Sequence, residues 1–258
     1  MSGFDSHPRL QNRGGFHTRP CCYFMLIFAH RGVFDRSITE NTLKAFQNAV
    51  AHGTHGIEFD VRVSRDGVPV IIHDETLDRI AGDARRVRDL TAQELQDLAL
   101  RGEGSIPTLN DVTASILAPT WLDIEIKDRE ALSLLITKLK TSSALRERVV
   151  VSSFVFDDLT MLSEALPDVK TLLLLRTWPL PFRGRALWQR VKQMHVWAIG
   201  LPVNVMREKR MNWLRKQGWL VAAWDLQPLK REARRLVRLA PDIAIVFKVQ
   251  TVNKLLGK

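Results

Sequence analysis

The chain has 258 residues, 45% of them hydrophobic, and a formal net charge of +10. This length suits one (β/α)8 barrel and is short for two large α/β domains. No apolar run approaches the ~20 residues that span a bilayer, and the two cysteines, Cys21 and Cys22, are adjacent, which fits no disulfide framework and suits a reducing compartment. We therefore expect a cytoplasmic protein, either free in solution or bound at a membrane surface.

The N-terminal segment differs from the rest of the chain. Residues 1–23 are polar, are broken by Gly and Pro, and lack the continuous apolar region of a signal peptide. We predict a flexible tail over 1–23 and one domain over 24–258. Met25 directly precedes the first apolar run and is a second candidate for the start of the natural chain; the sequence does not decide between the two.

An apolar strand opens the patterned part of the chain. The run "LIFAHRG" at 26–32 ends on His30, Arg31 and Gly32: a proton carrier, a fixed cation and a residue that lets the backbone turn. A buried strand usually gives way to turn residues instead. His30 and Arg31 at this strand end are therefore candidates for a catalytic or binding role.

Strands and helices then alternate. Residues 43–53 have helical periodicity with Gly53 as the expected end, 56–63 predict a second strand, and Asp66-Gly67 predicts a hairpin within 64–74. Later strands are expected at 121–127, 148–154, 169–175, 195–201, 218–224 and 242–247, and later helices include 90–100, which opens with a Thr91–Glu94 capping box, 129–142 and 157–167.

This alternation predicts parallel strands joined by right-handed crossovers. About eight strands favour a closed barrel over an open doubly wound sheet, and no Gly-x-Gly-x-x-Gly follows the first strand. We predict the α/β class: one (β/α)8 TIM barrel with a small hairpin insertion after the second strand.

Polar residues interrupt strands that should be apolar throughout. Taken singly, a strand-end histidine can be a hydrogen-bonded structural residue, and an Asp-x-Glu-x-Lys strand fits an exposed edge. A closed barrel has no edge, however, and its strand carboxyl ends surround one mouth. We therefore predict a single site at this mouth, made of His30, Arg31, Glu58, Asp60, His73, Glu125 and Lys127.

The residue types in this set indicate phosphate chemistry. Three carboxylates repel one another unless a cation lies among them, and oxygen ligands without Cys favour Mg²⁺ or Ca²⁺ over zinc. A guanidinium and an ammonium beside a metal suit a phosphate. Two histidines can transfer protons near neutrality. The sequence thus predicts metal-assisted cleavage of a phosphate ester.

These residues lie in motifs that resemble the glycerophosphodiester phosphodiesterase family, a phospholipase-C-like barrel: "AHRG" with "ENTLKAFQNAVAHGTHGIEFDVRVSRDGVPVIIHDETLDR" over 29–79, "IPTLNDV" at 106–112 and "WLDIEIKD" at 121–128. The resemblance implies hydrolysis of a glycerophosphodiester to glycerol 3-phosphate and an alcohol, with a cyclic phosphate as a conceivable intermediate. It matches His30 and His73 to the acid/base pair, Glu58, Asp60 and Glu125 to the metal carboxylates, and Arg31 and Lys127 to the phosphate-side cations.

The resemblance also assigns supporting and substrate-side residues. Glu40 and Asn41 fall in the family's "ENT" box and are expected to support the His-Arg-Gly turn, although Asn41 could equally be the N-cap of the next helix. Phe154 and Trp224 match residues near the substrate, and Phe154 could also be only core. The last third departs from the family: "WDLQ" follows Trp224, and Phe247-Lys248 stand where Thr-Asp is usual. The alcohol-side pocket is therefore not fixed by the resemblance.

The last third is strongly basic. Residues 176–216 contain ten Lys or Arg and one acid, and five Trp or Phe residues are interleaved with them. Tryptophans among basic residues are typical of a face that contacts anionic membranes, whereas an ordinary outer helix layer has the same composition. No nucleic-acid motif accompanies the charge, so we predict no nucleic-acid partner.

The function predicted first is glycerophosphodiester hydrolysis. The alternatives are the same chemistry on a lysophospholipid or other membrane lipid, and a non-catalytic barrel that binds anionic lipid or phosphate.

Overall fold

The computed structural model describes residues 25–179, 181–194, 196–226 and 230–257. The tail expected at 1–23 lies outside these residues. Among the helices described, none combines the length and the apolar character that crossing a bilayer requires.

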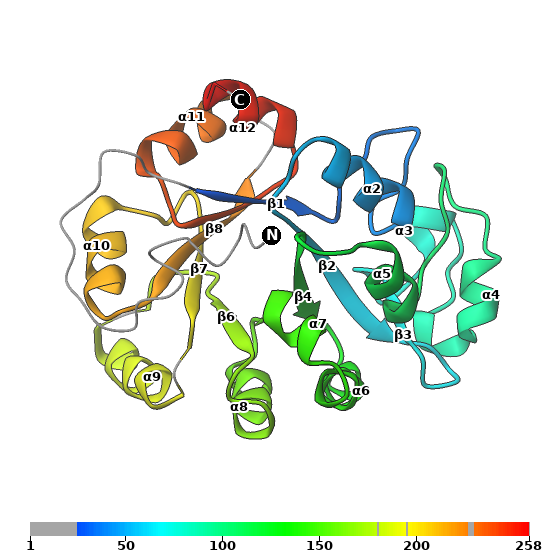
Figure 1. Cartoon of the computed structure of the whole chain (residues 1–258), viewed down its shortest axis with the longest axis horizontal. Coiled ribbons are helices and arrows are strands. Elements are labelled where there is room, and N and C mark those ends of the chain that lie inside the picture. Colours follow the sequence, from blue (N-terminus) through cyan, green and yellow to red (C-terminus); the bar gives the residue numbers. More distant parts are fainter. Residues whose placement is uncertain (1–24, 180, 195, 227–229, 258) are drawn as a thin grey trace.

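The described residues form a closed barrel of parallel strands (Figure 1), which confirms the predicted fold. Neighbouring strands follow the order β1-β9-β8-β7-β6-β5-β4-β2, and β1 also pairs with β2, which closes the sheet. The eight described barrel strands are β1 (Leu26–His30), β2 (Gly56–Val63), β4 (Trp121–Ile126), β5 (Val149–Ser153), β6 (Lys170–Leu174), β7 (Ala198–Pro202), β8 (Leu220–Leu226) and β9 (Ile243–Val246).

Each barrel strand leads to a helix on the outside of the barrel, as right-handed crossovers require (Figure 1). The outer helices are α2 (Leu43–Ala51), α5 (Leu109–Ser115), α6 (Arg129–Lys140), α7 (Ser143–Arg148), α8 (Phe156–Ala165), α9 (Pro181–Gln193), α10 (Glu208–Lys216), α11 (Lys230–Leu239) and α12 (Val249–Leu255).

The expected hairpin follows the second strand. Strand β3 (Pro69–Ile71) runs antiparallel to the outer end of β2, with Val61 opposite Ile71. The insertion continues through α3 (Asp78–Ala81), the short 3-10 helix η1 (Val87–Asp89) and α4 (Ala92–Gln96), and a separate apolar cluster fills its interior. Because β3 turns back toward the barrel, it returns the chain to the mouth at His73.

The alternation of side chains along the strands divides the core into two layers. One set of alternate residues, including Phe28, Val150 and Leu172, fills the barrel interior. The other set, including Ile27, Ile57 and Val151, packs against the outer helices. The polar residues of β2 and β4 take interior positions nearest the strands' carboxyl ends, so the apolar filling of the barrel ends where the site begins.

The turn after β1 depends on Gly32. Its φ of +86° lies in the left-handed region, and a Cβ there would lie 2.8 Å from the Cβ of Ala45 in α2. Gly53, with φ of +70°, has no heavy atom within 4 Å of its position for a Cβ. A substitution at either glycine would strain the backbone. Only a substitution at Gly32 would also overlap with α2.

Gly32→Ala should therefore destabilise the fold more than Gly53→Ala. Both changes cost about 1–2 kcal/mol for a left-handed alanine, and overlap with α2 adds about 1–3 kcal/mol for Gly32→Ala alone. Urea unfolding followed by circular dichroism measures both losses. Equal losses in the two variants would show that the close approach of the first turn to α2 does not constrain the fold.

Candidate active site

Three buried carboxylates form the centre of the mouth. Glu58 and Asp60 project from β2 and Glu125 from β4, where the strand register pairs Asp60 with Glu125. One oxygen from each of the three carboxylates lies within 4.8 Å of the others. The structure therefore brings together the three residues predicted as metal ligands.

Burial and mutual repulsion set the charge of this cluster. Burial, together with the neighbouring Asp60 and Glu125 carboxylates, raises the pKa of Glu58 well above its usual range. Burial and Asp60 likewise raise the pKa of Glu125. For Asp60 burial acts in the same direction, but Lys127 and Arg31 outweigh it and lower the pKa to about 2. Asp60 is therefore the fixed anion of the site.

The donor set fits a hard divalent cation. All three ligand groups are carboxylates, which Mg²⁺ and Ca²⁺ prefer, and Glu58 Oε1 is buried without a hydrogen-bond partner. A divalent cation among them would offset the repulsion that raises the pKa values of Glu58 and Glu125.

The two predicted phosphate-side cations flank the carboxylates. Arg31 Nε lies 3.2 Å from Asp60 Oδ2, and Lys127 Nζ lies 3.1 Å from Asp60 Oδ1. Lys127 also forms an ion pair with Glu125. The Arg31 and Lys127 side chains are mostly buried, so water competes little with their contacts to Asp60. These contacts hold both cations at the mouth.

The backbone around Arg31 and Asn41 is tightly constrained. Both residues have positive φ angles, +56° and +57°, which non-glycine residues seldom adopt outside constrained sites. The Asn41 N–H donates to the Arg31 carbonyl at 3.0 Å, and Asn41 Nδ2 donates to Asp60 Oδ2 at 2.9 Å. The helix N-cap is Thr42, whose side chain accepts from the Ala45 N–H. Asn41 is therefore not the N-cap, and its side chain serves the site.

His30 lies at the apolar edge of the mouth. Its Nε2 is 3.6 Å from Glu58 Oε2, too long for a hydrogen bond. Its ring packs edge-on against Phe247, with centroids 4.2 Å apart. Burial, reinforced by the charge of Arg31, lowers the pKa of His30 to about 3. Phe247, one of the two residues at which the last strand departs from the family pattern, thus forms a wall of the site.

His73 is held by a hydrogen bond to Asp74, which begins a chain of ion pairs. Its Nδ1 lies 2.6 Å from Asp74 Oδ1, and Asp74 in turn pairs with Arg79. Arg79 Nη2 donates to Glu40 Oε1 at 2.7 Å, and the same oxygen accepts from Arg31 Nη1 at 2.9 Å. Glu40 therefore contacts Arg31 in the turn and connects it through Arg79 and Asp74 to His73.

The protonation state of His73 follows from this contact. Despite the opposing effect of burial, hydrogen bonds from His73 and Arg79 lower the pKa of Asp74, so Asp74 accepts and Nδ1 carries the proton. Burial lowers the pKa of His73 itself. The neutral ring therefore keeps Nε2 as a proton acceptor.

An aromatic pair forms another part of the rim. Phe154 follows β5 and Trp224 lies in β8, and their rings meet edge-on with centroids 5.1 Å apart. The guanidinium of Arg176 lies over the Phe154 ring at 4.2 Å. Trp224 Nε1 is buried without a hydrogen-bond partner. Both aromatic rings also pack against the barrel interior, so Phe154 is partly core as well.

The structure places three further residues in or beside the site: Asp74, which the sequence puts beside His73 at a strand end without indicating its role, Arg79 and Arg176. Asp74 adjoins a predicted histidine, which is a usable signal. Arg79 lies on α3 of the insertion and reaches Glu40, 39 positions away, only through the fold. Arg176 directly follows the apolar run of a predicted strand, so its place near the mouth could have been anticipated.

A closed (β/α)8 barrel whose mouth joins buried carboxylates, two histidines and two cations holds the groups that metal-assisted cleavage of a phosphodiester uses. The glycerophosphoryl diester phosphodiesterase family matches residues 30–246, and the chain belongs to this family. Its members are phosphoric diester hydrolases.

Individual relatives agree with this assignment. A glycerophosphodiester phosphodiesterase of Caldanaerobacter subterraneus is 30% identical over 90% of this chain and 98% of its own length. The crystal structure of a glycerophosphodiester phosphodiesterase from Thermotoga maritima aligns with a TM-score of 0.74 and 28% sequence identity. The alignment covers 91% of this chain and 99% of the Thermotoga chain. An Oleispira antarctica phosphodiesterase, solved with the product sn-glycerol-3-phosphate, has a TM-score of 0.79 over 90% of this chain and 96% of its own; at 21% identity it shows the shared fold alone.

Asp74→Asn tests whether Asp74 positions His73. Loss of the anion removes the group that fixes the Nδ1–H tautomer, so kcat should fall about 10²–10⁴-fold while KM changes little. Because the hydrogen bond to Asp74 raises the pKa of His73, the acidic limb of kcat/KM should move to lower pH. Asp78→Asn, at an exposed position of α3, is the matched control. An unchanged pH profile in Asp74→Asn would remove Asp74 from this role.

Proposed function

We propose that the protein hydrolyses a glycerophosphodiester to glycerol 3-phosphate and an alcohol with the help of a divalent cation. One observation carries the proposal: on a barrel of this family, the buried cluster of Glu58, Asp60 and Glu125 lies at the same mouth as two histidines. Family membership supports the phosphodiester as the substrate, and the carboxylates support the cation.

The chain's own residues divide the work. Glu58, Asp60 and Glu125 would hold Mg²⁺ or Ca²⁺, which polarises phosphoryl oxygens when bound. Arg31 and Lys127 bind the remaining phosphate oxygens and balance the charge that spreads over them in the transition state. Because Asp60 contacts both cations, it fixes the phosphate-binding groups relative to the carboxylate cluster.

The histidines transfer the protons. His73 Nε2 accepts the proton of the attacking hydroxyl, and the nearby Asp74 carboxylate stabilises the resulting imidazolium. A new P–O bond forms as the bond to the alcohol breaks, and the leaving alcohol takes up one proton. We assign this donation to His30, which must first take up a proton, because burial lowers its pKa to about 3 and keeps the free ring neutral.

The organic part of the substrate would meet the aromatic rim. Trp224 offers an unpaired indole N–H and Phe154 a ring face beside Arg176. A lysophospholipid is the second candidate substrate. The observation that favours it is Phe247, whose ring makes the wall beside His30 apolar where the family usually has a polar residue.

An assay of glycerol phosphate release tests the proposal. A panel of glycerophosphodiesters and lysophospholipids is incubated with Mg²⁺, Ca²⁺ or EDTA. We expect turnover with a divalent cation and none with EDTA. His30→Ala and His73→Ala should each lower kcat about 10²–10⁴-fold, while His52→Ala, at the exposed end of α2, leaves it unchanged.

Several outcomes would contradict the proposal. Full activity in EDTA would exclude the cation, and full activity in either site variant would exclude the histidine pair. Absence of turnover across the panel, with phosphate or lipid binding retained, would favour the non-catalytic barrel. Turnover of lysophospholipids alone would establish the second candidate substrate.

A further inference from the structure

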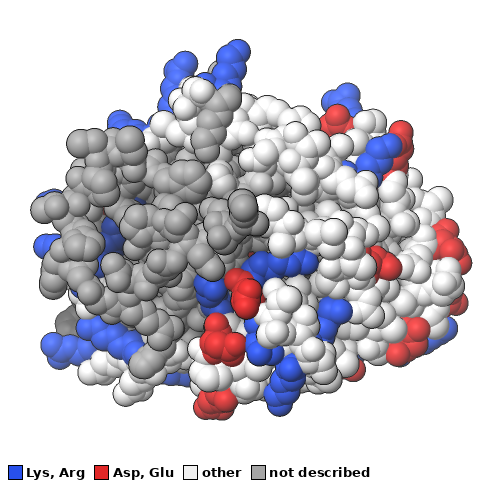
Figure 2. All heavy atoms as spheres, in the orientation of Figure 1, with Lys and Arg blue, Asp and Glu red and all other residues white. Residues whose placement is uncertain are grey.

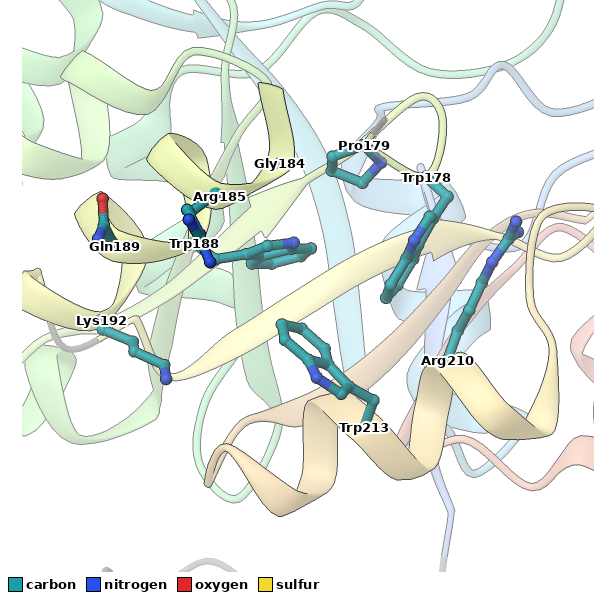
Figure 3. Close-up of a pocket in the computed structure, with 9 residues that line it drawn as sticks. All are labelled: Trp178, Pro179, Gly184, Arg185, Trp188, Gln189, Lys192, Arg210 and Trp213. Atoms are coloured by element: carbon teal, nitrogen blue, oxygen red, sulfur yellow. The ribbon is translucent and has the colours of Figure 1, made fainter. Parts of the chain in front are cut away.

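A pocket outside the catalytic mouth lies between α9 and α10. It encloses about 600 Å³ (Figure 3). We call it the tryptophan pocket. Its aromatic and cationic lining consists of Trp178, Trp188, Trp213, Arg185, Lys192 and Arg210. The three tryptophans also pack against the core beneath the outer helices, but the proposed reaction uses neither their rings nor the cations.

The three tryptophans form a continuous aromatic surface. The ring centroids of Trp188 and Trp213 are 5.0 Å apart, and Trp178 lies 5.7 Å from Trp188 and 5.9 Å from Trp213. Trp219, which is buried, packs behind them at 5.6 Å from Trp188. The three pocket rings are only half-buried, so the cluster offers apolar area that no other part of the described chain covers.

The cations of the pocket lack carboxylate partners. No ion pair joins Arg185, Lys192 or Arg210 to an acid among the described residues, whereas the nearby Arg190 pairs with Asp157 at 2.7 Å. The Arg210 guanidinium lies 5.1 Å from the Trp178 ring. In Figure 3 Arg210 lies on one side of the tryptophans, and Lys192 extends from α9 on the other side. Figure 2 shows Lys and Arg side chains along this edge of the molecule.

Chain topology places one end of the pocket at the mouth end of the barrel. Trp178 follows the carboxyl end of β6, and Arg210 lies in the first turn of α10, which follows β7. Both therefore belong to the end of the barrel at which Glu58 and Asp60 lie. Lys192 lies in the last turn of α9, which leads to the amino end of β7, so the pocket extends from the mouth end along the outer side of the barrel.

We propose that the tryptophan pocket binds an anionic phospholipid and so docks the protein on membranes. Arg185, Lys192 and Arg210 attract anionic headgroups at the membrane surface, and the glycerol and upper acyl chains of a lipid lie against the tryptophan rings. A single-stranded nucleic acid needs an extended basic track over several nucleotides, whereas this pocket has the volume of one compact ligand. Binding here requires no hydrolysis and stands apart from the proposed function.

Vesicle sedimentation tests the docking. The protein should pellet with vesicles of phosphatidylcholine and phosphatidylglycerol and not with phosphatidylcholine alone. The triple variant R185Q/K192Q/R210Q should lose affinity about 100-fold, because each cation near an anionic surface contributes roughly fivefold. The matched control R231Q/R234Q/R238Q removes three exposed cations from α11 and should retain most of the binding.

Fluorescence quenching tests whether the tryptophan rings contact the lipid. Brominated phosphatidylglycerol should quench tryptophan fluorescence in the parent protein, and Trp178→Ala, in a loop where truncation disturbs the fold least, should weaken the quenching. Hydrolysis of a water-soluble glycerophosphodiester should be unchanged in all these variants, which separates failure of docking from failure of the proposed function.

The proposal is overturned by equal binding to both kinds of vesicle, by equal loss in the two triple variants, or by quenching that Trp178→Ala leaves intact. A shift of the parent protein from dimer to monomer in R185Q/K192Q/R210Q would instead make the pocket an interface between copies of the chain. Pocket-dependent binding of a single-stranded oligonucleotide without lipid dependence would make it a nucleic-acid site.

Discussion

The site depends on one buried anion. Asp60 is fully buried, and it contacts Arg31, Lys127 and Asn41 at distances of 2.9–3.2 Å. An unpaired carboxylate at this depth would cost several kcal/mol, so the two cations and the amide must stay in place as long as Asp60 is ionised. Because Arg31 is thereby fixed, so is the turn that begins at His30, and through Glu40 the constraint extends to Arg79 and His73.

The barrel makes this arrangement possible. Interior side chains of parallel strands lie in layers, and the layer at the carboxyl ends has the outer helices around it and solvent on one side only. The carboxylates of β2 and β4 are therefore desolvated enough for strong electrostatic coupling, while the mouth remains open to a substrate. The hairpin insertion adds a histidine that no barrel strand supplies, because its second arm returns antiparallel to β2.

Much of the site could be predicted from the sequence because strand periodicity and the common mouth of a barrel are local rules. Glu58 and Asp60 are two positions apart, and Glu125 and Lys127 repeat that spacing, so each pair must share a face. The ion-pair chain from His73 to Glu40 could not be predicted, since Arg79 reaches it only when the insertion folds back. Asn41 was ambiguous because an asparagine before a helix suits both capping and a left-handed turn; the neighbouring Thr42 is the cap.

The five aromatic residues within 176–216 fitted both the core and the surface, and only the packing of α9 against α10 shows that three tryptophans line a pocket.

The central claim is that Glu58, Asp60 and Glu125 hold one divalent cation. Crystals grown with Mn²⁺ and measured for anomalous scattering test it most directly, with Glu58→Gln as the comparison. The account predicts a single strong anomalous peak in contact with all three carboxylates in the parent protein, and a weakened or lost peak in the variant. A mouth without a peak at saturating Mn²⁺, with Lys127 still paired to Asp60 and Glu125, would contradict it.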